Sequence, residues 1–377
     1  MSALRVLQVS AFFPGHGGGI EAVAGALAAR MPAAGVAMHW MAGGPREEWP
    51  ASWPGVTVTA EPAWDPLERR LGLPFPVWSP AALMRLWRRV GEHDVVHAHD
   101  FLYLPTLAAM LFAALRGRPV VLTQHIGDIP FRSRRAHRLL TLLNRSLGAF
   151  VLRRVAQAVF VGLPVQRYFE RFVRFRRPVC LVPNGVDHSL FHPPQTPPTG
   201  ELRLLFVGRF VEKKGLRLLH HCLDLPGASW TFVGSGPLEP PAGPQLRLAG
   251  RLGPQQVADA FRTADLLVLP STGEGFPLVV QEALASGTPV LVSTEVFEAF
   301  PGVDERCVFH VELRGATPEQ ALCERLQQLL GDPDRLRSAR PAAAELARQW
   351  NWDATVQRYV DLYRDLAPAA SHLLKSS

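Results

Sequence analysis

The chain has 377 residues, a formal net charge of +7 and a hydrophobic content of 47%. At about 100–200 residues per domain, this length predicts two or three domains, and the mixture of apolar and charged residues excludes intrinsic disorder. No apolar stretch approaches the roughly 20 residues of a membrane-spanning helix, and the first residues lack the apolar core of a signal peptide. We therefore expect a soluble, cytoplasmic protein.

The first half of the chain alternates short apolar segments with helical patterns. Residues 5–10 predict a strand, 15–19 a glycine-rich loop and 20–31 a helix. Further strands are predicted at 36–41, 56–59, 94–98, 119–123, 158–161 and 179–182. Helical patterns lie between several of these strands, which favours a parallel sheet with crossover helices.

A proline-rich segment separates this half from a second alternation of the same kind. Residues 192–200 (HPPQTPPTG) hold four prolines and predict a semi-rigid linker. After it, strands are predicted at 202–207, 229–233, 245–249, 266–269 and 289–293, and helices at 215–223, 254–263, 277–286, 317–330 and 333–349. We expect two α/β domains, 1–191 and 201–352, with a ligand-binding cleft between them.

Charge is distributed unevenly along the chain. Residues 1–195 carry a net charge of +10, whereas residues 196–377 carry −3. Within 131–177 there are 12 arginines and one acidic residue, Glu170, together with many leucines and phenylalanines. This composition fits contact with an anionic membrane or a phosphate-bearing acceptor, but it fits a solvated arginine-rich face equally well. No signature of a nucleic-acid-binding fold accompanies it.

The cysteines and a pair of histidines are the candidates for a disulfide or a metal site. The four cysteines (Cys180, Cys222, Cys307 and Cys323) are far apart and form no CxxC pair, so we expect reduced thiols without a disulfide. His97 and His99 share one face of a predicted strand that Asp100 follows. These three side chains could bind a metal, but a strand end needs no ion, and we predict no metal site.

Residues 273–293 (GEGFPLVVQEALASGTPVLVS) carry two carboxylates, Glu274 and Glu282. Pro277 suits the first turn of a helix, which places Glu274 in the preceding loop and Glu282 within the helix. The segment alone is also compatible with a surface helix that has two solvated acids.

The start of that helix suits an anion. The backbone N–H groups near Gly275 and Phe276 cluster at its positive end, which favours a diphosphate. Glu282 lies far enough along the helix to reach a ribose hydroxyl pair.

Residues 204–216 (LLFVGRFVEKKGL) place Arg209 and Lys214 just beyond a strand. A guanidinium and an ammonium at the C-terminal end of a strand suit a diphosphate leaving group, although a plain basic loop has the same pattern. The glycine loop at 15–19 matches neither a P-loop nor GxGxxG, and FVGSGPLE at 232–239 lacks the third glycine of a dinucleotide site.

These segments, in this order, resemble the family 4 retaining glycosyltransferases of the GT-B fold. The resemblance extends over nearly the whole chain, through GGGIEAVAGALA, DVVHAHD, VPNGVD, VGRFVEKKG, VGSGPL, the segment with two glutamates and NWDATVQRYVDLY. It implies two Rossmann-like domains that face each other across a cleft. It also implies that the last helix, within 353–377, crosses back to the N-terminal domain.

The resemblance also assigns roles to single residues. Catalytic roles fall to Glu274, His125, Arg209 and Lys214, and binding of the sugar donor to Gly18, Gly19, Arg209, Lys214, Arg251, Glu274, Gly275, Phe276 and Glu282. In these assignments the cations neutralise the diphosphate, Glu282 holds the ribose and His125 lies near the reacting sugar. Gly162 departs from the family pattern, in which a serine is usual, so the polar contact of that serine is not expected in this chain.

The activity so implied is a retaining, metal-independent transfer. A sugar moves from a UDP- or GDP-linked donor to a saccharide or lipid-linked acceptor, in the synthesis of bacterial surface polysaccharide or glycolipid, and no cofactor is needed. Two alternatives stay open, a nucleotide-sugar epimerase on the same fold and a non-catalytic subunit that binds nucleotide sugars. Peripheral contact of 131–177 with the inner face of the plasma membrane is a further expectation.

Overall fold

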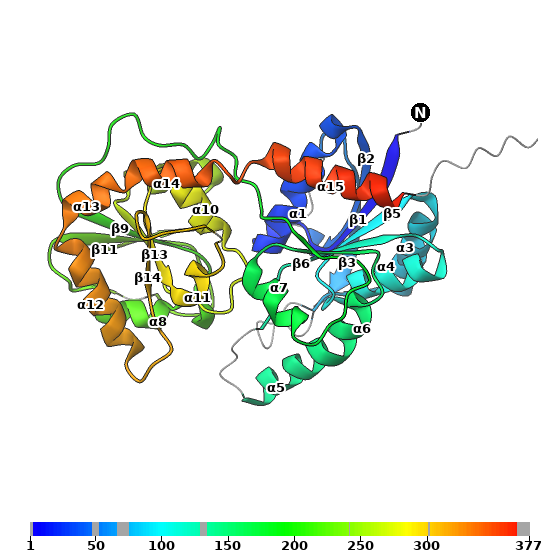
Figure 1. Cartoon of the computed structure of the whole chain (residues 1–377), viewed down its shortest axis with the longest axis horizontal. Helices are drawn as coiled ribbons and strands as arrows, with labels where there is room; N and C mark the ends of the chain where they lie inside the picture. The colour runs from blue at the N-terminus through cyan, green and yellow to red at the C-terminus, as the bar shows by residue number, and fades with distance from the viewer. Residues whose placement is uncertain are drawn as a thin grey trace, which may run out of the picture.

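The computed structural model describes residues 3–46, 53–65, 75–128, 134–240, 242–300 and 302–367. Figure 1 shows two lobes, each built around its own sheet, and the last described helix (red) lies along the top of one lobe after the chain has crossed over from the other. We call the lobe with β1–β8 the first lobe and the lobe with β9–β14 the second lobe. Among the described residues, none of the helices is both long and apolar enough to span a bilayer.

In the described part of the chain, the first lobe contains a sheet of eight strands. In their order across the sheet they are β4 (Val77–Trp78), β3 (Thr57–Trp64), β2 (Val36–Gly44), β1 (Leu4–Phe12), β5 (Val95–His99), β6 (Val120–Gln124), β7 (Gln157–Phe160) and β8 (Cys180–Leu181). Neighbouring strands are parallel except for the short edge strand β4, which is antiparallel to β3.

Helices connect these strands and cover both faces of the sheet. They are α1 (Gly19–Arg30), α3 (Pro80–Glu92), α4 (Leu104–Leu115), α5 (Arg134–Leu143), α6 (Ala149–Leu152) and α7 (Leu163–Glu170), with a π-helical turn at Asn144–Gly148 between α5 and α6 and 3-10 turns at Pro14–His16 and Pro32–Ala34. Because parallel strands need crossover connections, this alternation dictates the parallel sheet.

Among its described residues, the second lobe repeats the plan with six parallel strands. Their order is β11 (Leu246–Gly250), β10 (Ala228–Val233), β9 (Leu202–Val207), β12 (Leu266–Leu269), β13 (Val290–Ser293) and β14 (Val308–Val311). The helices are α8 (Leu216–Leu219), α9 (Pro254–Thr263), α10 (Leu278–Ala285), α11 (Thr294–Phe297), α12 (Pro318–Leu330), α13 (Pro333–Ser338) and α14 (Arg340–Ala347), with 3-10 turns at Glu212–Lys214 and His220–Cys222.

The last helix, α15 (Trp352–Leu366), belongs to the core of the first lobe. Val356, Tyr359, Val360 and Tyr363 are buried there against side chains of α1 and of the strands around β1. The apolar face of α15 therefore ties the segment that follows the second lobe to the first lobe. This arrangement confirms the predicted fold class, two Rossmann-like domains with a C-terminal helix that crosses back.

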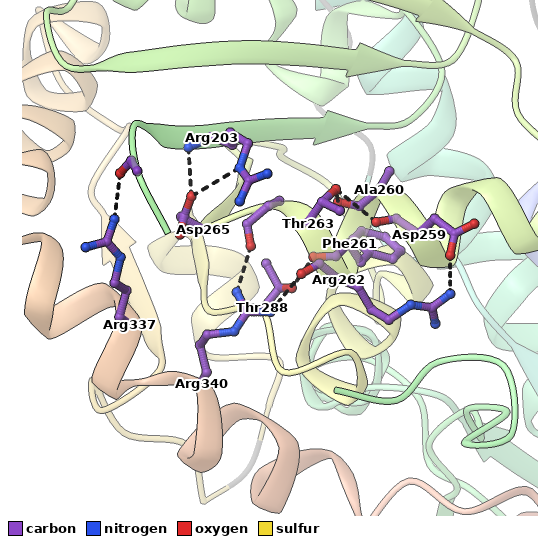
Figure 2. Close-up of polar contacts among 12 residues, drawn as sticks. Arg203, Asp259, Ala260, Phe261, Arg262, Thr263, Asp265, Thr288, Arg337 and Arg340 are labelled. Atoms are coloured by element: carbon purple, nitrogen blue, oxygen red, sulfur yellow. Dashed lines mark hydrogen bonds and ion pairs between the residues drawn. The ribbon is translucent and has the colours of Figure 1, made fainter. Parts of the chain in front are cut away.

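A polar cluster anchors α14 beneath the second sheet (Figure 2). The guanidinium of Arg340, which is only 6% exposed, donates to the carbonyl oxygens of Ala264 (2.7 Å) and Arg262 (3.1 Å) at the end of α9. Asp265 accepts the backbone N–H of Arg203 on β9 at 2.9 Å. The bonds of Arg340 satisfy backbone carbonyls at the end of α9 and fix α14 there, while Asp265 ties the start of β12 to β9.

The expectation of four reduced thiols is wrong for two of them. Cys222 and Cys323 form a disulfide between the turn after α8 and helix α12, across a sequence separation of 101 residues. Cys180 and Cys307 remain free. The spacing along the chain conceals this pair because the fold alone brings α8 and α12 together.

Candidate active site at the junction of the lobes

The predicted cationic loop and the loop with the first glutamate meet in the second lobe. Lys214 Nζ lies 2.8 Å and Lys213 Nζ 3.8 Å from Oε1 of Glu274. The backbone explains the meeting, because the N–H of Thr272 donates to the carbonyl of Lys213 at 2.8 Å. Gly215 has φ +72°, and a Cβ there would overlap the carbonyl oxygen of Pro270, so this approach requires glycine.

Burial by itself would raise the pKa of Glu274, but Lys214 and Lys213 outweigh it and hold the pKa below its ordinary value. Glu274 is therefore ionised at neutral pH. The cluster combines two ammonium groups with one carboxylate, which leaves a net positive charge for an anionic ligand.

Arg209 is carried by the loop directly after β9. The backbone N–H of Phe210 donates to the carbonyl of Ser235 at 2.9 Å, and Gly208 donates in the same way to Val233 at 3.0 Å. A Cβ at Gly234 would overlap the carbonyl oxygen of Gly208. The glycines of VGSG therefore serve to hold the arginine loop, while Arg209 itself is exposed and forms no ion pair with any described residue.

Glu282 lies in α10, as expected, with Pro277 at the N-cap instead of in the first turn. Its carboxylate has no hydrogen-bond partner among the described residues, and burial raises its pKa to about 7. A half-buried carboxylate without a partner is free to accept hydrogen bonds from a ligand. Phe276, by contrast, packs its ring against Phe300 and Trp350, so only its backbone is available to a ligand.

Two backbone contacts join the lobes at this place. A Cβ on Gly275 would overlap the carbonyl oxygen of His125, and a Cβ on Gly162 would overlap the carbonyl oxygen of Gly275. At a second point, Nη2 of Arg251 lies 2.8 Å from the position of a Cβ on Gly17. The two lobes therefore touch through glycines, at positions where a side chain would not fit.

The first lobe contributes His125, which directly follows β6. Asp100, at the end of β5, accepts the backbone N–H of His125 at 3.3 Å and a bond from the side chain of Gln124. Asp100 is fully buried and has φ +61°, the only non-glycine residue with positive φ in the described part of the chain. A strained, buried residue at this place is typical of a functional site.

The side chain of His125 belongs to a row of buried histidines. Its Nε2 lies 3.0 Å from Nδ1 of His99, and the ring of His99 packs at 4.4 Å from that of His97. Burial lowers the pKa of His97 and of His125 to about 3. These rings are therefore neutral at physiological pH. Among the described residues, no group of three or more His, Cys, Asp or Glu side chains is arranged to hold a metal ion.

The junction brings together most residues that the sequence singles out, but not all in the expected manner. Gly17, next to the predicted Gly18 and Gly19, lies against Arg251, and Gly18 lies against the side chain of Glu21, while the predicted approach of Gly18 and Gly19 to the phosphates stays a prediction. Sequence reasoning missed Lys213 and His99 as site residues. The sequence shows Lys213 next to Lys214 and His99 next to the strand end. The contacts of Lys213 with Glu274 and of His99 with His125 follow only from which strands are neighbours in the fold.

Two protein-family models match most of the chain. Residues 17–190 match Glycosyltransferase Family 4, and residues 201–332 match Glycosyl transferases group 1. The chain is 30% identical to D-inositol 3-phosphate glycosyltransferase 1 of Catenulispora acidiphila, over 82% of this chain and 81% of that protein. It is 31% identical to phosphatidyl-myo-inositol mannosyltransferase of Mycobacterium leprae, over 80% and 81%.

Solved structures share the fold. Sucrose-phosphate synthase from Thermosynechococcus elongatus superposes with a TM-score of 0.76 at 20% identity, covering 96% of this chain and 99% of that one. Anabaena Alr3699/HepE, in complex with UDP-glucose, gives a TM-score of 0.72 at 15% identity, covering 96% and 100%.

Proposed function

Since the chain belongs to glycosyltransferase family 4, and is thus an enzyme of the hexosyltransferase type, we propose that it transfers a sugar from a nucleotide-diphosphate donor with retention of configuration. The observation that carries the proposal is the pairing of Lys214 and Lys213 with Glu274 at the junction, opposite His125. The donor would lie with its diphosphate at these lysines and Arg209.

The charges of the second lobe suit a departing diphosphate. As the bond from the sugar carbon to the diphosphate oxygen breaks, negative charge grows on that oxygen, and preorganised cations stabilise it most effectively where water is excluded. The acceptor hydroxyl attacks the same face of the sugar, and its proton passes to the departing diphosphate. Arg209, Lys213 and Lys214 supply the positive charge, so no metal ion is required.

The remaining polar groups suit the other parts of the donor. Glu282, which has no partner among the described residues, is available to accept the two hydroxyl groups of a ribose. UDP-glucose in the complex of Alr3699/HepE, which shares the fold, supports a uridine donor. Arg251 lies at the second contact between the lobes, where the base would be placed.

The acceptor we propose is a saccharide or a lipid-linked sugar of the bacterial surface. Two relatives carry names that refer to inositol phosphate and phosphatidylinositol, which supports a polar cyclic acceptor, with a lipid in the second case. The first lobe also has an apolar cavity of about 270 Å³ whose lining includes Trp78, Leu83, Leu104 and Leu111. Because α4 begins shortly after the strand that carries His99, this cavity would hold the lipid chain near the site.

Helix α5 supports a peripheral contact with an anionic membrane. Leu139 and Leu142 are 57% and 62% exposed, and exposed arginines flank them on the same helix. Exposed apolar side chains among cationic ones favour the interface of an anionic bilayer. Figure 1 shows α5 at the lower edge of the first lobe, where the lobe can approach a surface.

The donor is tested by thermal unfolding with UDP, GDP, ADP and their sugars, followed by a transfer assay with and without EDTA. A nucleotide at 100 times its dissociation constant adds about 2.7 kcal/mol to the free energy of unfolding. We expect stabilisation by one nucleotide series and transfer that persists in EDTA. No shift with any nucleotide would contradict the proposal, and turnover of the donor sugar without an acceptor would favour an epimerase.

Sedimentation with phosphatidylglycerol vesicles at low salt tests the membrane contact. We expect the full chain to pellet, and Leu139→Ser combined with Leu142→Ser to abolish this. Leu248→Ser is the matched control, because Leu248 is 50% exposed on β11 in the other lobe. Equal pelleting of all three proteins, or of none, would speak against α5 as the contact.

A further inference from the structure

The imidazole rings of His99 and His125 are hydrogen-bonded to each other at the ends of two neighbouring strands. Nδ1 of His99 lies 3.0 Å from Nε2 of His125, and the two rings are stacked at 5.3 Å between centroids. Burial lowers the pKa of both rings far below neutrality, so each carries a single N–H. One ring must therefore donate this hydrogen bond and the other must accept it.

The surroundings of His99 decide which ring donates. Its other nitrogen, Nε2, is fully buried and has no partner among the described residues. If His99 accepted at Nδ1, its proton would lie on Nε2 as an unpaired N–H in the interior. If His99 donates from Nδ1, its buried Nε2 keeps only a lone pair without a partner, and the second N–H lies on Nδ1 of His125, which is not among the fully buried atoms without partners. Buried N–H groups without partners are the rarer of the two, so the second arrangement is favoured.

We propose that His99 is a positioning residue that donates from Nδ1 to Nε2 of His125 and thereby fixes His125 as the tautomer with its proton on Nδ1. This inference rests on the proposed function, in which His125 lies beside the transferred sugar. Nδ1 of His125 has no hydrogen-bond partner among the described residues, so the fixed tautomer presents an N–H donor to a sugar oxygen at the junction.

The neighbours of His99 hold its ring in this orientation. The ring of His97 packs against it, and both nitrogens of His97 are engaged, Nε2 with Thr123 at 2.8 Å and Nδ1 with Tyr363 of α15 at 2.7 Å. The backbone of His125 is held separately by Asp100. Ring and backbone are thus fixed by different partners, and replacing His99 changes the proton position without removing the backbone anchor.

Nitrogen-15 NMR of the histidine side chains in the full-length protein tests the tautomer directly. The His125→Gln variant identifies the signals of His125 by their loss. We expect the native His125 to carry its proton on Nδ1, and His99→Phe to shift the population toward Nε2. A native His125 protonated on Nε2, or an unchanged tautomer in His99→Phe, would overturn the proposal.

Kinetics then test the consequence. We expect His99→Phe to lower kcat about tenfold with little change in the KM for the donor, and His99→Asn, whose amide can donate near the position of Nδ1, to restore part of the loss. His39→Phe is the control, because His39 is also buried and hydrogen-bonded on the same sheet, at β2. It should lower stability without changing kcat.

The roles of His125 and of His99 are distinguished by separate variants. A native rate in His125→Phe would remove the proposed role of His125 while leaving the NMR result on His99 intact. A native rate in His99→Phe, together with a slow His125→Phe, would overturn the positioning role of His99 alone.

Discussion

The two lobes share a parallel-sheet plan but present opposite chemistry at their junction. The second lobe contributes charges, with Lys213 and Lys214 around Glu274. The first lobe contributes neutral rings, His99 and His125, whose pKa values burial has lowered. Each set follows the C-terminal end of a parallel strand, which is where open α/β sheets bind ligands.

The difference matches what each wall has to recognise. A departing diphosphate gains charge during the reaction, so the wall beside it needs fixed cations. A sugar stays largely uncharged on its hydroxyl groups, so directed hydrogen bonds from neutral groups suffice there. The average charge of each half conceals this division, since the half with the cationic loop carries a net −3.

Removing the charge of the second lobe should have the largest effect. We expect Lys214→Ala to lower kcat on the order of 100-fold, because one stabilising donor at a developing charge contributes about that much. Lys213→Ala is the matched control and should cost less, since Lys213 Nζ lies 3.8 Å from Glu274 against 2.8 Å for Lys214. Steady-state rates with thermal unfolding curves check this, and native rates in both variants would contradict the assignment.

Separating the lobes should have the next largest effect. A Cβ at Gly162 would overlap the carbonyl oxygen of Gly275, so Gly162→Ser should hold the walls apart. We expect kcat/KM to fall about tenfold, the cost of a small misplacement of reacting groups, with stability almost unchanged. The control is Gly127→Ala on the same wall, where the nearest atom would lie 3.5 Å away. Equal kcat/KM in the two variants would show that this contact does not limit the reaction.

The sequence predicts local structure well because local structure follows from periodicity. Strands 202–207 and 266–269 have the predicted bounds, since each is a short apolar run. The predicted single helix at 333–349 is divided, because Pro341, in the first turn of α14, cannot continue the preceding helix α13.

Contacts between distant segments are what the sequence leaves open. The approach of Gly162 to Gly275 depends on the distance between the lobes, and the Cys222–Cys323 disulfide depends on the packing of α12. The His99–His125 bond likewise depends on which strands are neighbours. Motif order indicated where the site lies, but the partners of each side chain required the fold.

The hydrogen bonds that join α15 to the buried His97 and Thr123 of the first lobe should affect stability more than catalysis. Tyr363→Phe removes the 2.7 Å bond to Nδ1 of His97 and leaves a buried group without a partner. We expect the free energy of unfolding to fall by about 1 kcal/mol. Tyr359→Phe, which removes the bond to Thr123 at 2.9 Å, should behave alike. Chemical denaturation of both single variants and the double variant would show a non-additive loss, whereas full additivity would mean that the two bonds are independent.

The smallest effect concerns Glu282, a half-buried carboxylate of the second lobe that pairs with no cation among the described residues. Burial raises the pKa of Glu282 to about 7, above the roughly 4.3 of an unfolded chain. Between these values the folded state binds the extra proton, so the stability of the free enzyme falls as the pH rises toward 7. UDP affinity should rise a few-fold from pH 6 to pH 8, because the ionised carboxylate accepts the ribose hydroxyls better. Calorimetry with Glu282→Gln separates this from titration of the nucleotide itself. If the UDP affinity of the native protein and that of Glu282→Gln change equally with pH, Glu282 does not contact the ribose. The second lobe would then bind the donor through its cations alone.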